Sequence, residues 1–253
     1  MPTRNWKHVL ITGASAGIGE EYARQLAQRC GRLTLVARRE DRLHALAGDL
    51  REHCEVEVLA ADLGNPVGLA AVVELTRQRD PVDLLVNNAG FSTLGPFAAS
   101  DLDAELEMVR LHLDASMALC RAVLPGMRDS GAGAIINVAS VAAFLPLPGV
   151  ATYAATKAFL ASFSQALQRE LADASVSVQC LCPGYTRTEI HSRDSFSGFD
   201  SSRVPEEMWM EAGEVVAESL AALERGDTLV VPGAQNRALV REALAALQAE
   251  LAD

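Results

Sequence analysis

Short runs of β-branched and aliphatic residues alternate with Ala- and Leu-rich stretches along the chain, and no other feature constrains the fold as strongly. The runs predict strands over 8–12, 33–37, 56–60, 84–87, 134–138, 176–180 and 229–231. The stretches predict helices over 17–29, 40–53, 66–79, 101–128, 151–173, 206–224 and 235–251. This repetition predicts an α/β fold, a parallel sheet with helices on both faces. No Pro/Gly-rich linker divides the alternation, so we expect 1–253 to form one domain.

The first predicted strand leads into a glycine-rich turn with the pattern G-x-x-x-G-x-G, and a helix follows. Glycine allows the tight turn and lets the backbone approach a pyrophosphate closely. The N-terminus of the helix offers free N–H groups and the positive end of its dipole to that anion. The turn therefore predicts a dinucleotide-binding site with contacts from Gly13, Ser15, Gly17, Ile18 and Gly19.

Two arginines follow the second predicted strand, where an NAD-binding protein tends to carry an acidic residue for the ribose 2′-hydroxyl. The guanidinium groups of Arg38 and Arg39 suit a 2′-phosphate, which arginine binds bidentately, and they favour NADP(H). The alternative is that both are solvated surface charges. Asp62 and Leu63 follow the third strand as candidate cofactor contacts. The Asp62 carboxylate either accepts a hydrogen bond from the adenine amine or caps the helix that begins near Pro66.

Further motifs, taken with the glycine-rich turn, follow the order of a known family. They are Thr12-Gly13-x-x-x-Gly17-Ile18-Gly19, Asn87-Asn88-Ala89-Gly90, Ser140, Tyr153-x-x-x-Lys157 and Pro183-Gly184. Together they make the chain resemble the short-chain dehydrogenase/reductases over nearly its whole length. The resemblance implies a Rossmann-type, doubly wound sheet of seven parallel strands, a nicotinamide cofactor, and a homodimer or homotetramer. It also implies cofactor contacts from Asn88, Ala89, Gly90, Tyr153, Lys157, Pro183, Gly184, Thr186 and Thr188.

Tyr153 and Lys157 stand four residues apart on one predicted helix, so their side chains can converge on its surface. Tyrosine has a reference pKa of about 10, too high for efficient proton transfer near neutrality. An ammonium group about 4–5 Å away is expected to lower that pKa by roughly 2–3 units, which suits a general acid or base. Ser140 follows the fifth strand, where α/β sheets place ligands, and its hydroxyl is expected to hold the substrate oxygen.

His112 lies in the long predicted helix 101–128, where by the same resemblance the family usually carries an asparagine. In the family this asparagine anchors a chain of water molecules to the lysine. A histidine can hold the same water, although it titrates near pH ~6.5. The other interpretation is a plain core or interface histidine. We include His112 with Ser140, Tyr153 and Lys157 as a candidate catalytic residue.

Composition excludes several classes of partner. The formal net charge of −11 opposes nucleic acid and anionic membranes as partners. No apolar run reaches the roughly 18 residues of a membrane span, and 1–7 carry no apolar signal segment. The five cysteines form no C-x-x-C motif, as is typical of reduced thiols in a cytoplasmic chain. The five histidines lack metal-ligand spacing, so we expect no metal site.

The stretch 189–205 has no clear period and predicts either a surface loop or a substrate lid reaching to about 210. Apolar side chains are expected to line a substrate pocket: Ala142, Phe144, Leu145, Leu147, Tyr185, Phe196, Phe199 and Trp209. The predicted helix 151–173 is apolar nearly all round, so it is expected to pack on the sheet and, with the helix 101–128, on a second copy of the chain.

These features predict an NADPH-dependent oxidoreductase that transfers a hydride between nicotinamide and a carbonyl or alcohol. By resemblance, the substrate is a hydrophobic ketone, a ketoacyl compound or a steroid-like molecule. One alternative is a catalytically silent, NADP(H)-binding regulatory protein. Another is dehalogenase chemistry on the same fold; relatives with that chemistry lose the glycine-rich turn and replace the lysine by arginine, and this chain keeps both.

Overall fold

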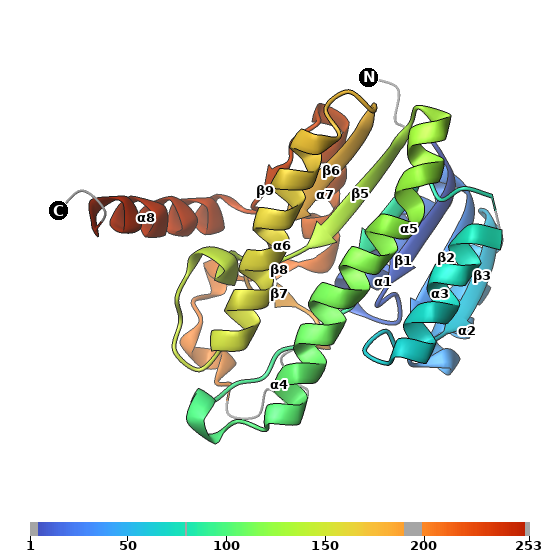
Figure 1. Cartoon of the computed structure of the whole chain (residues 1–253). Coiled ribbons are helices and arrows are strands. Elements are labelled where there is room, and N and C mark those ends of the chain that lie inside the picture. The colour runs from blue at the N-terminus through green and yellow to red at the C-terminus, as the bar shows by residue number, and fades with distance from the viewer. Residues whose placement is uncertain (1–4, 79, 190–198, 251–253) are drawn as a thin grey trace.

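The computed structural model describes residues 5–78, 80–189 and 199–250 (Figure 1). Seven parallel strands form one sheet in the order β3-β2-β1-β4-β5-β6-β9. Their bounds are Trp6–Thr12 (β1), Cys30–Ala37 (β2), Glu55–Ala60 (β3), Leu84–Asn87 (β4), Gly133–Val138 (β5), Val176–Leu181 (β6) and Leu229–Val230 (β9). This architecture confirms the predicted α/β class and the doubly wound, seven-stranded parallel sheet.

Helices cover both faces of the sheet, because each strand-to-strand crossover carries one. Their bounds are Gly17–Leu26 (α1), Glu40–Leu50 (α2), Pro66–Gln78 (α3), Leu102–Val109 (α4), Ala115–Ser130 (α5), Ala151–Glu170 (α6), Ala212–Arg225 (α7) and Ala234–Glu250 (α8). One apolar core joins the sheet to α1, α2 and α7, through residues such as Tyr22, Leu43 and Val215. A second core joins the opposite face to α3 and α5, through residues such as Val72 and Leu119.

The order of the strands locates the expected ligand site. From β1 the chain first winds outward through β2 and β3, then crosses back to β4 on the other side of β1. Ligands of such sheets bind beyond the carboxyl ends of the strands, at the point where the winding reverses. The glycine-rich turn follows β1 at this point, and Asn88, which directly follows β4, lies beside it.

Two predicted helices differ from the structure. The helix expected over 101–128 is interrupted by a π-helical turn, Arg110–Asp114, between α4 and α5. The helix expected from 206 begins only at Ala212, where the Glu211 and Glu214 side chains form a capping box. Before it, Met210–Glu211 (β8) pair with Thr186–Arg187 (β7) in a separate two-stranded parallel sheet.

Within the predicted lid, 190–198 lie outside the described residues. The described part from 199 to 210 contains 3-10 turns at Ser201–Arg203 and Glu206–Met208. Within the described residues, no helix has both the length and the apolar character that a membrane crossing requires. No three His, Cys, Asp or Glu side chains of the same residues form a group able to hold a metal ion.

Candidate active site

A cavity of about 650 Å³ lies at the carboxyl ends of the strands and collects the predicted site residues from seven separate parts of the sequence. Those that line it are Gly13, Ser15, Gly17, Ile18, Arg38, Arg39, Asp62, Leu63, Asn88, Ala89, Gly90, Ser140, Tyr153, Lys157, Pro183, Gly184, Thr186 and Thr188. Gly19 and His112 do not line it. The structure thus brings together all but two of the predicted catalytic and cofactor-binding residues.

The glycine-rich turn leaves an open cradle at the start of α1. Gly13 and Gly17 have φ angles of +67° and +57°, which other residues rarely adopt. A Cβ atom at Gly19 would lie 2.4 Å from the Gly13 carbonyl oxygen, so only glycine at position 19 lets the turn pack this closely. Asn88 donates from Nδ2 to the Thr12 carbonyl oxygen at 3.0 Å and holds the turn against β4. With α1 beginning at Gly17, this cradle fits a dinucleotide pyrophosphate.

The arginines after β2 point in different directions. Arg39 donates from Nε and Nη2 to the Ser15 hydroxyl at 3.2 and 3.1 Å, so its guanidinium lies over the glycine-rich turn. Arg38 instead pairs with Glu107 at 3.5 Å and Asp62 at 4.0 Å. Asp62 does not cap α3, because Asn65 accepts the Val67 N–H there at 2.9 Å. The carboxylate of Asp62 accepts the Gly64 N–H at 3.0 Å and faces the cavity.

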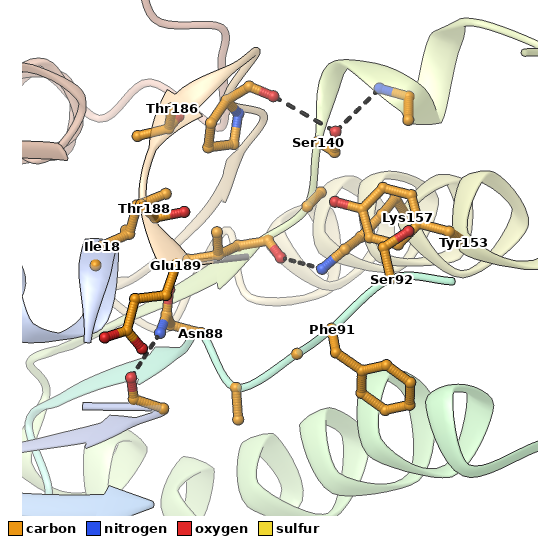
Figure 2. A pocket seen from close by; sticks show the side chains of 18 of the residues that line it. Ile18, Asn88, Phe91, Ser92, Ser140, Tyr153, Lys157, Thr186, Thr188 and Glu189 are labelled. Atoms are coloured by element: carbon orange, nitrogen blue, oxygen red, sulfur yellow. Dashed lines mark hydrogen bonds between the residues drawn. The ribbon is translucent and has the colours of Figure 1, made fainter. Parts of the chain in front are cut away.

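Ser140, Tyr153 and Lys157 gather at the other end of the cavity (Figure 2). Lys157 is buried and donates from Nζ to the Val138 carbonyl oxygen at 2.9 Å. The same Nζ lies 5.5 Å from the centre of the Tyr153 ring. Ser140 follows β5, and its hydroxyl oxygen accepts the Ala142 N–H at 3.2 Å, which fixes the side chain. The i, i+4 spacing on α6 therefore brings the two side chains together as expected.

The expected fall in the pKa of Tyr153 was wrong for the cofactor-free protein. Burial raises the pKa of Tyr153 above its usual value, and the hydrogen bond with Ser140 offsets only part of the rise. Burial also lowers the pKa of Lys157 to about 8. Desolvation penalises both charged forms, and it outweighs the attraction between ammonium and phenolate that the sequence argument considered alone. Tyr153 is therefore a neutral phenol at neutral pH.

His112 lies in the π-helical turn, buried beneath the cavity. Its Nε2 accepts the Phe91 N–H at 3.3 Å, and its Nδ1 bonds the Thr156 hydroxyl at 2.8 Å. The Thr156 hydroxyl in turn donates to the Tyr153 carbonyl oxygen at 2.8 Å, so Nδ1 carries the proton that the hydroxyl accepts. Burial, followed by the charge of Lys157, holds the pKa of His112 well below 6.5. Both ring nitrogens of a neutral imidazole are thus engaged by the protein.

The predicted substrate residues divide into three groups. Ala142, Leu145, Leu147 and Tyr185 line the cavity. Phe199 and Trp209 pack on Tyr185, with ring centres 5.9 and 5.4 Å away, and so support the cavity wall from outside. Phe144 does not line the cavity; it packs against the buried cluster of Ala139, Leu160 and Cys180. Phe196 lies outside the described residues.

Several lining residues were not foreseen. They include Phe91, Ser92, Asn236 and Leu239. Glu189 and Met208 also line the cavity, and both belong to the predicted lid. Asn236 lies at the start of α8, where a Cβ atom at Gly184 would be 2.2 Å from its Oδ1, which explains the need for glycine there. The four residues that were not foreseen come from segments whose proximity depends on the tertiary structure.

Comparison with known proteins identifies the class. Residues 7–195 match the family model described as short chain dehydrogenase. The chain belongs to the short-chain dehydrogenase family of oxidoreductases.

Particular members resemble the chain to different extents. A short-chain dehydrogenase from Sphingobium yanoikuyae, solved in complex with NADPH, is 39% identical with a TM-score of 0.86, over 98% of this chain and 95% of that one. The bulky-bulky ketone specific alcohol dehydrogenase from Comamonas testosteroni is 33% identical with a TM-score of 0.81, over 97% and 95%. The very-long-chain 3-oxoacyl-CoA reductase of Anas platyrhynchos is 33% identical over 197 residues, 76% of this chain.

The chain spans about three fifths of the length of these curated relatives. The match spans only 63% of the length of the Anas platyrhynchos reductase. A human relative, inactive hydroxysteroid dehydrogenase-like protein 1, is 31% identical over 191 residues, 74% of this chain and 58% of its own length.

Proposed function

We propose that the protein is an NADP(H)-dependent oxidoreductase that reduces a hydrophobic carbonyl compound to an alcohol, or carries out the reverse reaction. One observation carries the proposal. Ser140, Tyr153 and Lys157 converge at one end of a single cavity whose other end presents the glycine-rich turn and Arg39. In this proposal the cofactor and the substrate therefore bind next to each other in one cavity.

Each side chain at the reacting end has a separate role in this proposal. The bound nicotinamide supplies or accepts the hydride. The Tyr153 phenol donates a proton to the carbonyl oxygen, because its raised pKa keeps it protonated at neutral pH. The Ser140 hydroxyl orients that oxygen, and the Lys157 ammonium stabilises the phenolate that remains. His112 acts through position, since it holds the Phe91 backbone and Thr156 and does not reach the cavity.

The choice of NADP(H) rests on charge. The chain carries a net charge of −11, yet the Arg39 guanidinium lies beside the glycine-rich turn, where it suits a 2′-phosphate. The NADPH complex of the similar Sphingobium yanoikuyae protein supports the same choice. The residues that hold the cofactor in this proposal are those of the glycine-rich turn, Arg38, Arg39, Asp62, Leu63, Asn88, Ala89, Gly90, Lys157, Pro183, Gly184, Thr186 and Thr188.

The proposed apolar class of substrate is based on the side chains that line the cavity. Leu145, Leu147, Tyr185 and Met208 line the same cavity as Ser140 and Tyr153, and such a lining favours an apolar substrate. The similarity to a reductase of very-long-chain 3-oxoacyl-CoA and to a dehydrogenase of bulky ketones points the same way. We further infer a cytoplasmic location and a homodimer or homotetramer.

A second candidate is a silent NADP(H)-binding regulator, which the similarity to an inactive human relative favours. The intact Ser140, Tyr153 and Lys157 set opposes it. The deciding experiment follows NADPH oxidation over a panel of aldehydes, bulky ketones and 3-oxoacyl thioesters, with Tyr153→Phe as the control. Turnover of at least one ketone or thioester, lost in the control, supports the enzyme. NADPH binding without turnover across the panel supports the regulator.

A further inference from the structure

The carboxylate of Glu189 bridges two arginines within the cofactor part of the cavity. Its Oε2 accepts from Arg39 Nη1 at 2.7 Å, and its Oε1 pairs with Arg42 Nη1. Glu189 follows β7, whereas Arg39 and Arg42 lie at the start of α2, 150 and 147 residues earlier in the chain. Figure 2 shows Glu189 beside Thr188 and Ile18, across the cavity from Tyr153. We call Arg39, Arg42 and Glu189 the bridging cluster.

The bridging cluster has a fixed orientation over the glycine-rich turn. Ser15 accepts two hydrogen bonds from the Arg39 guanidinium, which leaves Nη1 for an anion. Thr188 lies against the same turn, since a Cβ atom at Gly17 would be 2.8 Å from its methyl carbon. This approach of Thr188 to the turn places its neighbour Glu189 within reach of the arginines.

We propose that Glu189 occupies, in the cofactor-free protein, the anion position that the 2′-phosphate of NADP(H) takes on Arg39 and Arg42, and so sets the discrimination between NADPH and NADH. The inference rests on the cofactor preference proposed above. A phosphate monoester carries a charge of about −1.5 to −2 and three acceptor oxygens, against one charge and two oxygens for the carboxylate. Two anions on one pair of arginines repel each other, so the phosphate replaces the carboxylate.

The exchange is feasible because the bridging cluster is accessible to solvent. The side chains of Glu189, Arg39 and Arg42 are 41%, 34% and 45% exposed, so the carboxylate can leave without unfolding of the surrounding structure. Arg42, followed by Arg39, lowers the pKa of Glu189 to about 2, so the carboxylate remains charged at neutral pH. Ion pairs this exposed contribute little each, and two of them change a dissociation constant by roughly 3- to 20-fold.

Neutralising the carboxylate tests the proposal. The variant Glu189→Gln is titrated with NADPH, NADH and 2′,5′-ADP, and dissociation constants are compared with the wild type. We expect NADPH and 2′,5′-ADP to bind roughly 3- to 20-fold more tightly, and NADH to change by less than about twofold. Glu224→Gln is the matched control, because Glu224 pairs with Arg29 at 3.6 Å at similar exposure and does not line the cavity. It changes the net charge equally and should bind all three ligands as the wild type does.

The outcomes separate this inference from the proposed function. Unchanged or weaker NADPH binding by Glu189→Gln, in a wild type that prefers NADPH, overturns the role of Glu189 alone. A wild type that does not prefer NADPH and does not bind 2′,5′-ADP overturns the cofactor preference and the inference together. Glu189→Ala serves as a second variant with the same expected result, and thermal unfolding of both variants at the wild-type temperature shows that their folds are intact.

Discussion

Tyr153 keeps its proton in the free protein because burial raises its pKa and disfavours the charged phenolate. Replacing Tyr153 by Phe removes the proton donor and leaves the shape of the cavity. We expect kcat for the best carbonyl substrate to fall by about 10²–10⁴-fold, the usual contribution of general acid catalysis. NADPH affinity, measured by fluorescence titration, should stay within a few-fold of the wild type. Near-normal turnover by this variant contradicts the assignment of Tyr153.

Lys157 gives the reaction a dependence on pH. Burial lowers the pKa of Lys157 to about 8, so the free protein loses this positive charge above that pH. The charge stabilises the phenolate of Tyr153, and kcat/KM for NADPH in the reductive direction should therefore fall about tenfold per pH unit above ~8. The measurement is a profile from pH ~6 to ~10.4. A flat profile up to the ordinary lysine pKa of about 10.4 would show that the ammonium form is not required.

The two arginines after β2 contribute unequally. Arg39 is fixed over the glycine-rich turn by Ser15, whereas Arg38 pairs with Glu107 and Asp62. Arg39→Ala should weaken NADPH binding by roughly 10- to 100-fold, because charge-assisted hydrogen bonds contribute about 1.5–3 kcal/mol each. Arg38→Ala should have a smaller effect, the double variant the largest, and NADH binding should change least in all three. Equal losses for NADPH and NADH would contradict a phosphate contact.

At the scale of single elements, the π-helical turn Arg110–Asp114 presents His112 to both Phe91 and Thr156. His112→Ala leaves the Phe91 N–H without its acceptor and opens a cavity, so the free energy of unfolding should fall by about 2–4 kcal/mol. Thr156→Val removes only the hydroxyl and should cost less. Urea unfolding measures both. A stable His112→Ala variant with a shifted pH profile of kcat would instead show that His112 takes part in proton transfer.

The elements that the sequence predicted correctly are those with a strong local pattern. Strands β1, β2, β4 and β5 each contain a buried aliphatic run, and most motif residues of the cavity lie in short segments that follow the strands. The π-helical turn was missed because its apolar spacing differs little from that of an α-helix. Strands β7 and β8 have two residues each, too few to show alternation. The sequence placed Glu189 in the lid but did not predict its pairing with Arg39, because the two residues are 150 positions apart.

On the scale of the whole molecule, α6 exposes a row of small residues along one side, namely Ala151, Ala155, Ala158, Ser162 and Ala166. Nearby helices expose large apolar side chains, with Leu102 on α4 at 61% and Met117 on α5 at 38%. Small residues let helices approach closely, so we expect two copies to associate through these helices. Sedimentation at micromolar concentration should give the mass of a dimer or tetramer. A monomer alone at that concentration would exclude this association.

The pairing of β7 with β8 separates the residues that shape the substrate end of the cavity from the seven-stranded sheet. These two strands hydrogen-bond to each other and form no ladder with the seven-stranded sheet. They nevertheless carry the chain between Tyr185, beside the cavity, and Trp209, which packs on it. Substitutions at Tyr185, Met208 and Trp209 therefore reshape the substrate end while leaving the register of the large sheet intact. Substitutions at these positions, whether natural or from a library of variants, can therefore change the substrate specificity with little loss of folded protein.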